Sequence, residues 1–179
     1  GIGRMVLIDN DCVCVSNINR QLIAFHSTLG RPKVDVMRER ILDINPQARV
    51  EAIRDWYDAD SSGRLLRSEY SCIADAIDSI PSKIDLIVRA QAMGIPIISS
   101  MGAGNKKDPS RFELADIYNT SVCPLAKRMR YELRKRKIRK LRVVYSRETP
   151  VKPDYGSLTP EPGQANPPGS LAYVPAVAG

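Results

Sequence analysis

Short apolar runs alternate along the chain with segments whose apolar residues recur every three or four positions. The run Met5–Ile8 is continuous, which is typical of a strand buried in a parallel sheet. Val34, Met37 and Ile41 instead recur at helical spacing and predict a helix. By the same reasoning, the first hundred residues are expected to form alternating strands and helices over Arg4–Asp9, Arg31–Asn45, Arg49–Ile53, Ser61–Glu69, Cys72–Ile77, Ser82–Met93 and Ile95–Ser99.

This order predicts an α/β fold, with a mainly parallel sheet flanked by helices. We expect residues 1–101 to form the core and residues 102–179 to form a smaller C-terminal extension of the same folded unit. The extension is expected to contain a basic helix and two additional strands, over Pro124–Lys137, Phe112–Ile117 and Leu141–Tyr145. Proline is concentrated in segment 147–169, which predicts a mobile loop.

Length and composition limit the class of protein. A chain of 179 residues with 43% hydrophobic residues can build one hydrophobic core. No apolar run approaches the roughly 20 residues that span a bilayer, and no signal peptide opens the chain. We therefore expect a cytoplasmic protein without a membrane partner. The four cysteines form no Cys-x-x-Cys pair, which argues against structural zinc and favours free thiols.

Positive charge is concentrated in one segment. The formal net charge is +7, and ten of the 27 lysines and arginines lie between Lys127 and Arg142, beside the single acid Glu132. Such a density attracts polyanions through counterion release, so nucleic acid is the natural partner. The alternative is a solvated helix face. The residues expected to contact RNA are Lys127, Arg128, Arg130, Arg134, Lys135, Arg136, Lys137, Arg139 and Lys140.

A nucleotide site is indicated where the first strand ends. Asp9 closes that strand, and a carboxylate there can accept the hydroxyls of a ribose. Arg20 follows in a polar loop and can bind phosphate oxygens through its guanidinium. The glycines of Gly1-Ile2-Gly3 precede a strand, whereas a phosphate-binding glycine loop follows one. We therefore expect such a loop to lie before residue 1 and this fragment to be inactive alone.

The first hundred residues resemble the adenylation domain of ubiquitin-activating enzymes and their bacterial ThiF/MoeB/HesA relatives. The motifs that carry this resemblance are Asp9–Asp11, Ser16–Gln21, Gly30–Lys33, Ile44–Pro46 and Asp75–Ser79. The second half resembles the branch of tRNA threonylcarbamoyladenosine dehydratases, in Gly102–Lys106, Asp108–Pro109, Asp116–Ile117, Thr120–Ala126 and Val143–Glu148. The lack of zinc-binding cysteine pairs agrees with this branch and weakens the molybdopterin and thiamin branches.

The resemblance implies a Rossmann-like sheet, with residues 1–101 as the adenylation core, and it implies ATP and Mg²⁺ as cofactors. In that branch, ATP activates the threonyl carboxylate on a modified tRNA adenosine, which then closes into a ring with net loss of water. A homodimer and a sulfur-relay protein partner are also expected. An alternative is adenylation of the C-terminal glycine of a ubiquitin-like sulfur-carrier protein. A third hypothesis is a nucleotide-sensing or RNA-binding module without turnover.

The resemblance also assigns residues to roles. Arg20, Lys33 and Asp78 are implied to be catalytic, with Asp78 as the magnesium ligand. The residues implied to bind the nucleotide are Asp9, Asp11, Asn17, Arg20, Gln21 and Lys33. The alternatives are a loop or capping acid for Asp9, a surface arginine paired with Asp11 for Arg20, a solvated lysine for Lys33, and a helix cap for Asp78.

Six further residues are expected to lie outside the predicted site. Cys123 precedes Pro124 at an expected helix start, which favours a reactive thiol, but ring closure needs no covalent enzyme intermediate. Cys12 and Cys14 are expected to be packing residues. His26 is expected to lie at a helix end. Asp75 is expected to be structural, and Lys83 matches a recurring family position without an assigned role.

Overall fold

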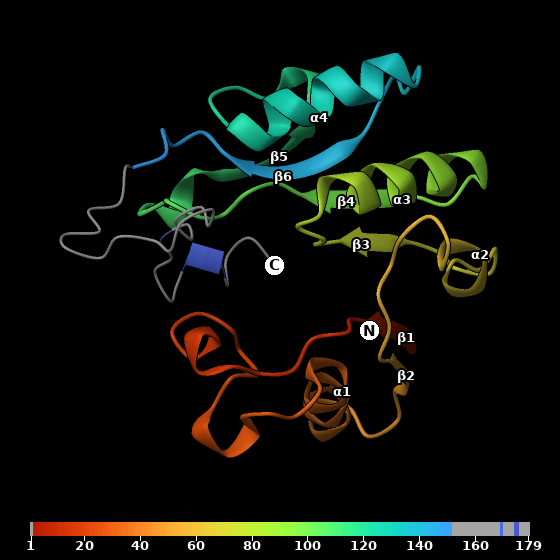
Figure 1. Ribbon diagram of the computed structural model, residues 1–179, viewed down its shortest axis with the longest axis vertical. Coiled ribbons are helices and arrows are strands. Elements are labelled where there is room, and N and C mark those ends of the chain that lie inside the picture. The colour runs from red at the N-terminus through yellow and green to blue at the C-terminus, as the bar shows by residue number, and fades with distance from the viewer. Residues whose placement is uncertain (1, 152–168, 170–173, 176–179) are drawn as a thin grey trace. The chain divides into compact units, whose positions relative to one another are not determined.

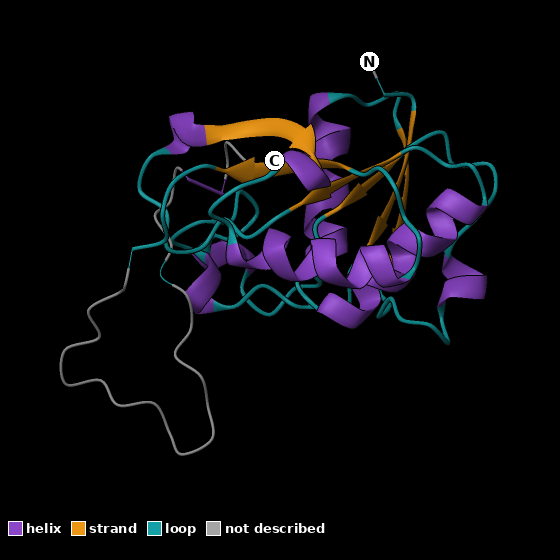
Figure 2. Cartoon of the chain, turned by 90° about the horizontal axis from the view of Figure 1, so that it is seen from above, coloured by secondary structure: helices purple, strands orange, loops and turns teal. Residues whose placement is uncertain are grey.

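The computed structural model describes residues 2–151, 169 and 174–175. The predicted loop 147–169 lies mostly outside these residues. The chain divides into two compact units, Gly1–Arg67 and Ser68–Gly179, and each is described by itself. The described chain contains both helices and strands (Figure 2), and α-helices alternate with strands from Arg4 to Ser100, as is typical of the α/β class. The described residues include no helix with the length and apolar character needed to cross a bilayer.

The first unit is built around a pair of parallel strands. β1 (Arg4–Ile8) pairs with β2 (Arg49–Ile53) from Arg4 opposite Arg49 to Ile8 opposite Ile53. Helix α1 (Lys33–Ile44) connects them and contacts both strands (Figure 1). Pro32 precedes α1, where its fixed φ suits a helix start, and the helix ends at the extended residue Asn45.

A long loop links β1 to α1 and has a hydrophobic cluster of its own. It contains two short 3-10 helices, Val15–Asn17 and His26–Thr28. Val13, Ile23 and Ala24 of the loop are buried together with Val36 of α1. This packing fixes the polar residues of the loop relative to the end of β1.

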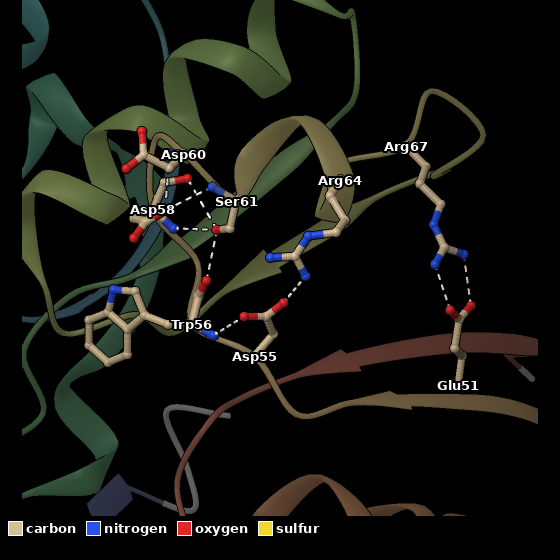
Figure 3. Close-up of polar contacts among 8 residues, drawn as sticks. All are labelled: Glu51, Asp55, Trp56, Asp58, Asp60, Ser61, Arg64 and Arg67. Atoms are coloured by element: carbon tan, nitrogen blue, oxygen red, sulfur yellow. Dashed lines mark hydrogen bonds and ion pairs between the residues drawn. The ribbon is translucent and has the colours of Figure 1, made fainter.

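Ion pairs join the short helix α2 (Ser62–Leu65) and the residue after its end to β2 and the segment that follows β2, and hydrogen bonds stabilise the turn before α2 (Figure 3). Arg67 donates two hydrogen bonds to Glu51, at 2.8 and 2.5 Å, and Arg64 bonds Asp55. Asp58 accepts the N–H of Ser61 at 2.8 Å, which caps the turn that leads into α2.

The second unit contains a four-stranded sheet in the order β3-β4-β6-β5. β3 (Ile73–Asp75), β4 (Ile97–Ser100) and β6 (Arg142–Ser146) are parallel to one another. β5 (Phe112–Asp116) runs antiparallel to β6, with Phe112 opposite Ser146. The sheet is therefore mainly parallel, with an antiparallel strand added at the β6 edge.

Helices α3 (Ile80–Ala92) and α4 (Pro124–Lys135) lie side by side on this sheet (Figure 1). Their apolar faces share one core with β6, made by Ile84, Ile87, Met129, Leu133, Val143 and Tyr145. The polar face of α4 is left exposed, because only one stripe of its residues is buried.

The predicted elements are all present, and most of their bounds differ from the prediction by one or two residues. The strands pair in two sheets, one in each unit, whereas the sequence suggested one sheet. Helix α2 is four residues long, shorter than the predicted Ser61–Glu69, because Leu66 is already extended. Helix α3 begins at Ile80, two residues before the predicted start. The predicted division at residue 101 stays a prediction.

Candidate nucleotide site and basic surface

The carboxyl end of β1 presents Asp9 as predicted. The N–H of Asp9 donates to Ile53 O at 3.3 Å, which extends the pairing of β1 with β2 by one residue. Oδ1 of Asp9 accepts the N–H of Asp11 at 2.8 Å, and the Asp9 side chain is half-buried. The second carboxylate oxygen has no hydrogen bond within the described residues. Asp9 is thus both a turn-forming acid and a carboxylate with an oxygen available to a ligand.

Lys33 contacts Asp11 at the start of α1. Its Nζ lies 2.6 Å from Asp11 Oδ2, and its backbone N–H donates to Asp11 O at 2.9 Å. The Lys33 side chain is 14% exposed, so the alternative of a solvated lysine is wrong. Two predicted nucleotide-binding residues are therefore in direct contact, and they place an ammonium group beside the end of β1 and the start of a helix.

Arg20 does not pair with Asp11, the alternative considered for it from the sequence. Its guanidinium donates to Ser16 O at 2.6 Å and to Asn19 Oδ1 at 3.1 Å, so it folds back onto its own loop. This leaves Arg20 without a carboxylate partner among the described residues. Its positive charge is not neutralised there, which suits a group that binds phosphate.

Asn17 and Gln21 have different surroundings. Asn17 is buried, and its Oδ1 accepts the N–H of Cys14 at 3.1 Å, so it stabilises the 3-10 turn. Oε1 of Gln21 is buried without a hydrogen-bond partner among the described residues. A buried acceptor without a donor costs free energy unless a ligand supplies one. The hydroxyl or amino groups of a nucleotide could supply that donor.

Asp75 and Lys83 form a buried ion pair in the second unit, with Nζ 2.9 Å from Oδ2 and both side chains fully buried. Ser99 donates to the same carboxylate at 2.6 Å, and Lys83 also donates to Ile77 O at 2.9 Å. Burial lowers the pKa of Lys83, while the charge of Asp75 opposes this shift. Asp75 is therefore structural, as expected, and Lys83 is its partner.

This network shapes the loop that carries Asp78. Asp75 Oδ1 accepts the N–H of Ile77 at 3.0 Å, while Lys83 bonds the carbonyl of the same residue. Asp78 itself is exposed and accepts no hydrogen bond within the described residues. Because the described residues contain no cluster of three metal-ligating side chains, Mg²⁺ at Asp78 would need phosphate and water as further ligands.

Asp78 and the β1 residues belong to different units. The assignment of Asp9, Arg20, Lys33 and Asp78 to one nucleotide site therefore stays a prediction. Within the first unit, Asp9, Asp11 and Lys33 are linked by direct contacts.

A second network was not anticipated from the sequence. Lys106 is 3% exposed, and its Nζ donates to the backbone oxygen of Glu148. The carboxylate of Glu148 accepts the N–H groups of Lys107 and Asp108, each at 3.0 Å. Burial lowers the pKa of Lys106, and the charges of Cys123 and Glu148 oppose the shift. These contacts hold the glycine-containing loop 102–108 against the segment that follows β6.

The remaining candidates outside the site lie as follows. Cys123 is buried at the start of α4, where a substrate could not reach it without movement. Cys14 is exposed and Cys12 is partly buried, so the expectation of two packing residues is wrong for Cys14, which lies on the loop surface. His26 is exposed and opens a 3-10 helix.

The basic residues of α4 and of the segment after it are displayed at the surface. Ala126, Met129 and Leu133 are buried on the opposite face of the helix. Eight of the nine predicted RNA-contacting residues are exposed, and Arg130 is half-buried. Arg130 donates to Thr120 O at 3.0 Å, and Arg136 pairs with Glu132 at 2.8 Å. These two arginines therefore have structural partners within the chain.

Comparison with known proteins identifies the family. Residues 1–144 match the model of the ThiF family. The chain belongs to the ThiF family. The tRNA threonylcarbamoyladenosine dehydratase of Bacillus subtilis is 43% identical over 187 residues, which cover 100% of this chain and 74% of that protein. The Escherichia coli protein of the same name is 40% identical over 134 residues, which cover 75% of this chain but 50% of that protein.

Solved structures give the same placement within the ThiF family. Crystal structures of the Escherichia coli tRNA N6-threonylcarbamoyladenosine dehydratase in complex with AMP and with ATP match with TM-scores of 0.85 and 0.82. Their sequences are 34% and 33% identical, and each match covers 98% of this chain and 71% or 72% of the other. The Rossmann-like fold class is confirmed.

Proposed function

We propose that this ThiF-family chain is the adenylating part of a tRNA threonylcarbamoyladenosine dehydratase. The observation that carries the proposal is the group at the end of β1. It contains a carboxylate with an oxygen available and a lysine at a helix start, and, within the part of the chain that the structure describes, an arginine without an acidic partner and a buried amide oxygen without a donor. These groups suit the hydroxyls and phosphates of ATP. A relative of that name, from Bacillus subtilis, matches across the whole chain, which supports the substrate assignment.

The reaction follows from the chemistry of a carboxylate, which is a poor electrophile. A carboxylate oxygen of the threonyl group attacks the α-phosphorus of ATP, and pyrophosphate leaves. A nitrogen of the same modified adenosine then attacks the carbonyl carbon of the acyl adenylate, and AMP leaves as the ring closes. The tRNA has then lost the elements of one water. Both steps build negative charge on phosphate oxygens, so positioned cations are the main requirement.

Each residue has a proposed part in this sequence. Asp9 would accept the ribose hydroxyls, and Lys33 and Arg20 would bind phosphate oxygens. Asp11 would orient the Lys33 ammonium group through the contact that already joins them. Asn17 would act by shaping the loop that presents Arg20 and Gln21.

Asp78 is the proposed magnesium residue, and its exposed carboxylate suits a hard cation. When bound, Mg²⁺ would neutralise charge on the phosphates. The Asp75–Lys83 pair would hold the loop of Asp78 in place, through the two bonds to Ile77.

The basic residues of α4 and the segment after it would bind tRNA, and a cytoplasmic location is part of the same proposal. We further propose a homodimer and a sulfur-relay protein partner, as the resemblance implies. Sedimentation of the intact protein tests the dimer.

The test of the activity uses the intact protein with ATP and tRNA that carries the open modification. The mass of the modified nucleoside should fall by one water, and AMP and pyrophosphate should form in equal amounts. If the mass is unchanged and pyrophosphate exchange requires a ubiquitin-like sulfur carrier, the carrier reaction is the correct one.

Replacement of Asp78 distinguishes an enzyme from a nucleotide- or RNA-binding module without turnover. In Asp78→Asn, we expect turnover to fall by about 10²-fold or more, because removing a single preorganised charge from a phosphoryl site has effects of this size. Binding of tRNA should be nearly unchanged, since Asp78 is not part of the basic surface. Equal turnover of Asp78→Asn and the parent protein would remove Asp78 from the proposed mechanism.

A further inference from the structure

A hollow lies at the carboxyl end of α4, within the second unit. Its volume is about 460 Å³, and it is lined by Tyr118, Arg134, Lys137, Ile138 and Arg139. Three of the five lining residues carry positive charge, and none carries negative charge. The side chains of these three cations are exposed, so a ligand can reach them. A concave surface with charge of one sign concentrates counterions, so this hollow suits an anion.

Arg134 is held in place by the aromatic ring of Tyr118, which also lines the hollow. Its guanidinium carbon lies 5.3 Å from the centre of the Tyr118 ring, which is a cation–π distance. The hydroxyl of Tyr118 donates to Ile138 O, so the ring is itself fixed. The contact positions Arg134 without neutralising it, because the ring carries no net charge.

Lys137 has a backbone conformation that a side chain disfavours. Its φ is +58°, and its N–H donates to Arg134 O at 3.0 Å, while Ile138 N–H donates to Leu133 O at 3.0 Å. This is the left-handed end of a helix, a place where glycine is the usual residue. A lysine at this position makes the fold less stable than a glycine would. Its side chain adds a positive charge to the lining of the hollow.

Other cations of α4 are engaged within the chain. Arg130 bonds Thr120, Arg136 pairs with Glu132, and Lys135 lies over the Tyr131 ring at 4.0 Å. Among the described residues, Arg134, Lys137 and Arg139 form no ion pair with a carboxylate. The nine basic residues are therefore not equivalent.

We propose that this hollow binds a phosphodiester of the RNA backbone. Arg134, Lys137 and Arg139 contact the phosphate oxygens, and Tyr118 acts as a positioning residue for Arg134. The inference rests on the proposed function, which supplies RNA as the ligand, and it narrows the basic surface to one defined phosphate contact. Lys127 and Arg128, at the other end of α4, do not line the hollow and serve as the comparison.

The test compares two variants that each lose two positive charges. The first is Lys137→Gly with Arg139→Gln, and the second is Lys127→Gln with Arg128→Gln. Labelled tRNA is titrated with the intact protein over a range of salt concentrations. Each lost phosphate contact lowers the slope of log affinity against log salt by about 0.7–0.9, so the first variant, which loses the single contact of the hollow, should lose about 0.7–0.9 and the second less than about 0.5.

Stability separates this effect from unfolding. Lys137→Gly removes the left-handed strain, so the first variant should melt at the same temperature as the parent or above it while binding RNA more weakly. Equal slopes for the two double variants would overturn the phosphate site and leave the proposed reaction intact. Failure of the parent protein to bind tRNA even at low salt would instead overturn the RNA assignment of the proposed function.

The positioning role of Tyr118 has its own readout. Tyr118→Phe keeps the ring under Arg134 and should bind tRNA with nearly the parent salt slope. Tyr118→Leu removes the ring and should reproduce the loss seen in Arg134→Gln. If Tyr118→Leu binds as well as Tyr118→Phe, the ring has no part in binding.

Discussion

At the scale of single residues, Lys83 shows what a polar side chain on the apolar face of a helix requires. Ile80, Lys83, Ile84 and Ile87 recur at helical spacing, so Lys83 lies on the stripe that packs against the sheet. The sequence therefore indicates a buried partner for Lys83, because a lysine at a core position needs an anionic group beside it. It does not identify the partner, since Asp75 comes from another element.

The Asp75–Lys83 pair leads to a prediction about folding. Lys83→Met should lower the free energy of unfolding by about 3–5 kcal/mol, because Asp75 is left charged and buried without its partner. The double variant Asp75→Asn with Lys83→Met removes both charges and should recover most of this loss. Urea unfolding measures both. A single variant as stable as the parent would show that Asp75 is not charged in the fold.

At the scale of elements, the α2 segment depends on carboxylates whose pKa values are lowered in the fold. The hydrogen bonds from Arg67 and Arg64 lower the pKa values of Glu51 and Asp55 below their ordinary values of 4.5 and 3.8. A carboxylate whose pKa is lowered in the fold stabilises the protein at pH values above its pKa in the unfolded state. This stabilisation is lost as the pH falls through the pKa of the folded state.

We therefore expect the protection of amides in residues 55–67 against hydrogen exchange, measured relative to the intrinsic exchange rate at each pH, to fall below about pH 4.5, as the unfolded carboxylates begin to bind protons first. The effect should be small, because these ion pairs are exposed. Glu51→Gln should make this protection less dependent on pH and weaker at neutral pH. Protection that stays constant down to pH 3 in the parent protein would contradict the role of these contacts.

Element boundaries were predicted well where the chain carries local signals. Pro32 and Asn45 mark the two ends of α1, and the predicted strand Arg49–Ile53 is observed with the same bounds. Pairing between strands was predicted less well. The antiparallel direction of β5 and the division into two sheets depend on hydrogen bonds between distant segments, which local periodicity does not report.

The candidate site shows the same limit. Asp9 was chosen because it lies at the end of a strand, and Lys33 because the family resemblance implies a lysine at the start of the following helix. The contact of Lys33 with Asp11 spans 22 positions and was not predicted. Similarly, spacing predicts a basic face on α4, but it cannot separate Arg136, which has an internal partner, from Arg139, which lines the hollow.

At the scale of the whole molecule, the proposed mechanism needs residues from both units to act on one nucleotide. ATP with Mg²⁺ should therefore slow hydrogen exchange in two separate segments of the intact protein, 9–33 and 75–83. The first should respond because it would bind the ribose and phosphates. The second should respond because Asp78 would bind the metal, and its loop is held by the buried pair below it.

Asp78→Asn is the matched control for this experiment, since it preserves size and leaves the first unit unchanged. In this variant, ATP should still protect segment 9–33, although more weakly, while protection of segment 75–83 should be lost. Protection of segment 9–33 alone in the parent protein would mean that the nucleotide is bound without Asp78. Magnesium would then be bound by phosphate and water alone. Arg20 and Lys33 would be the remaining catalytic side chains.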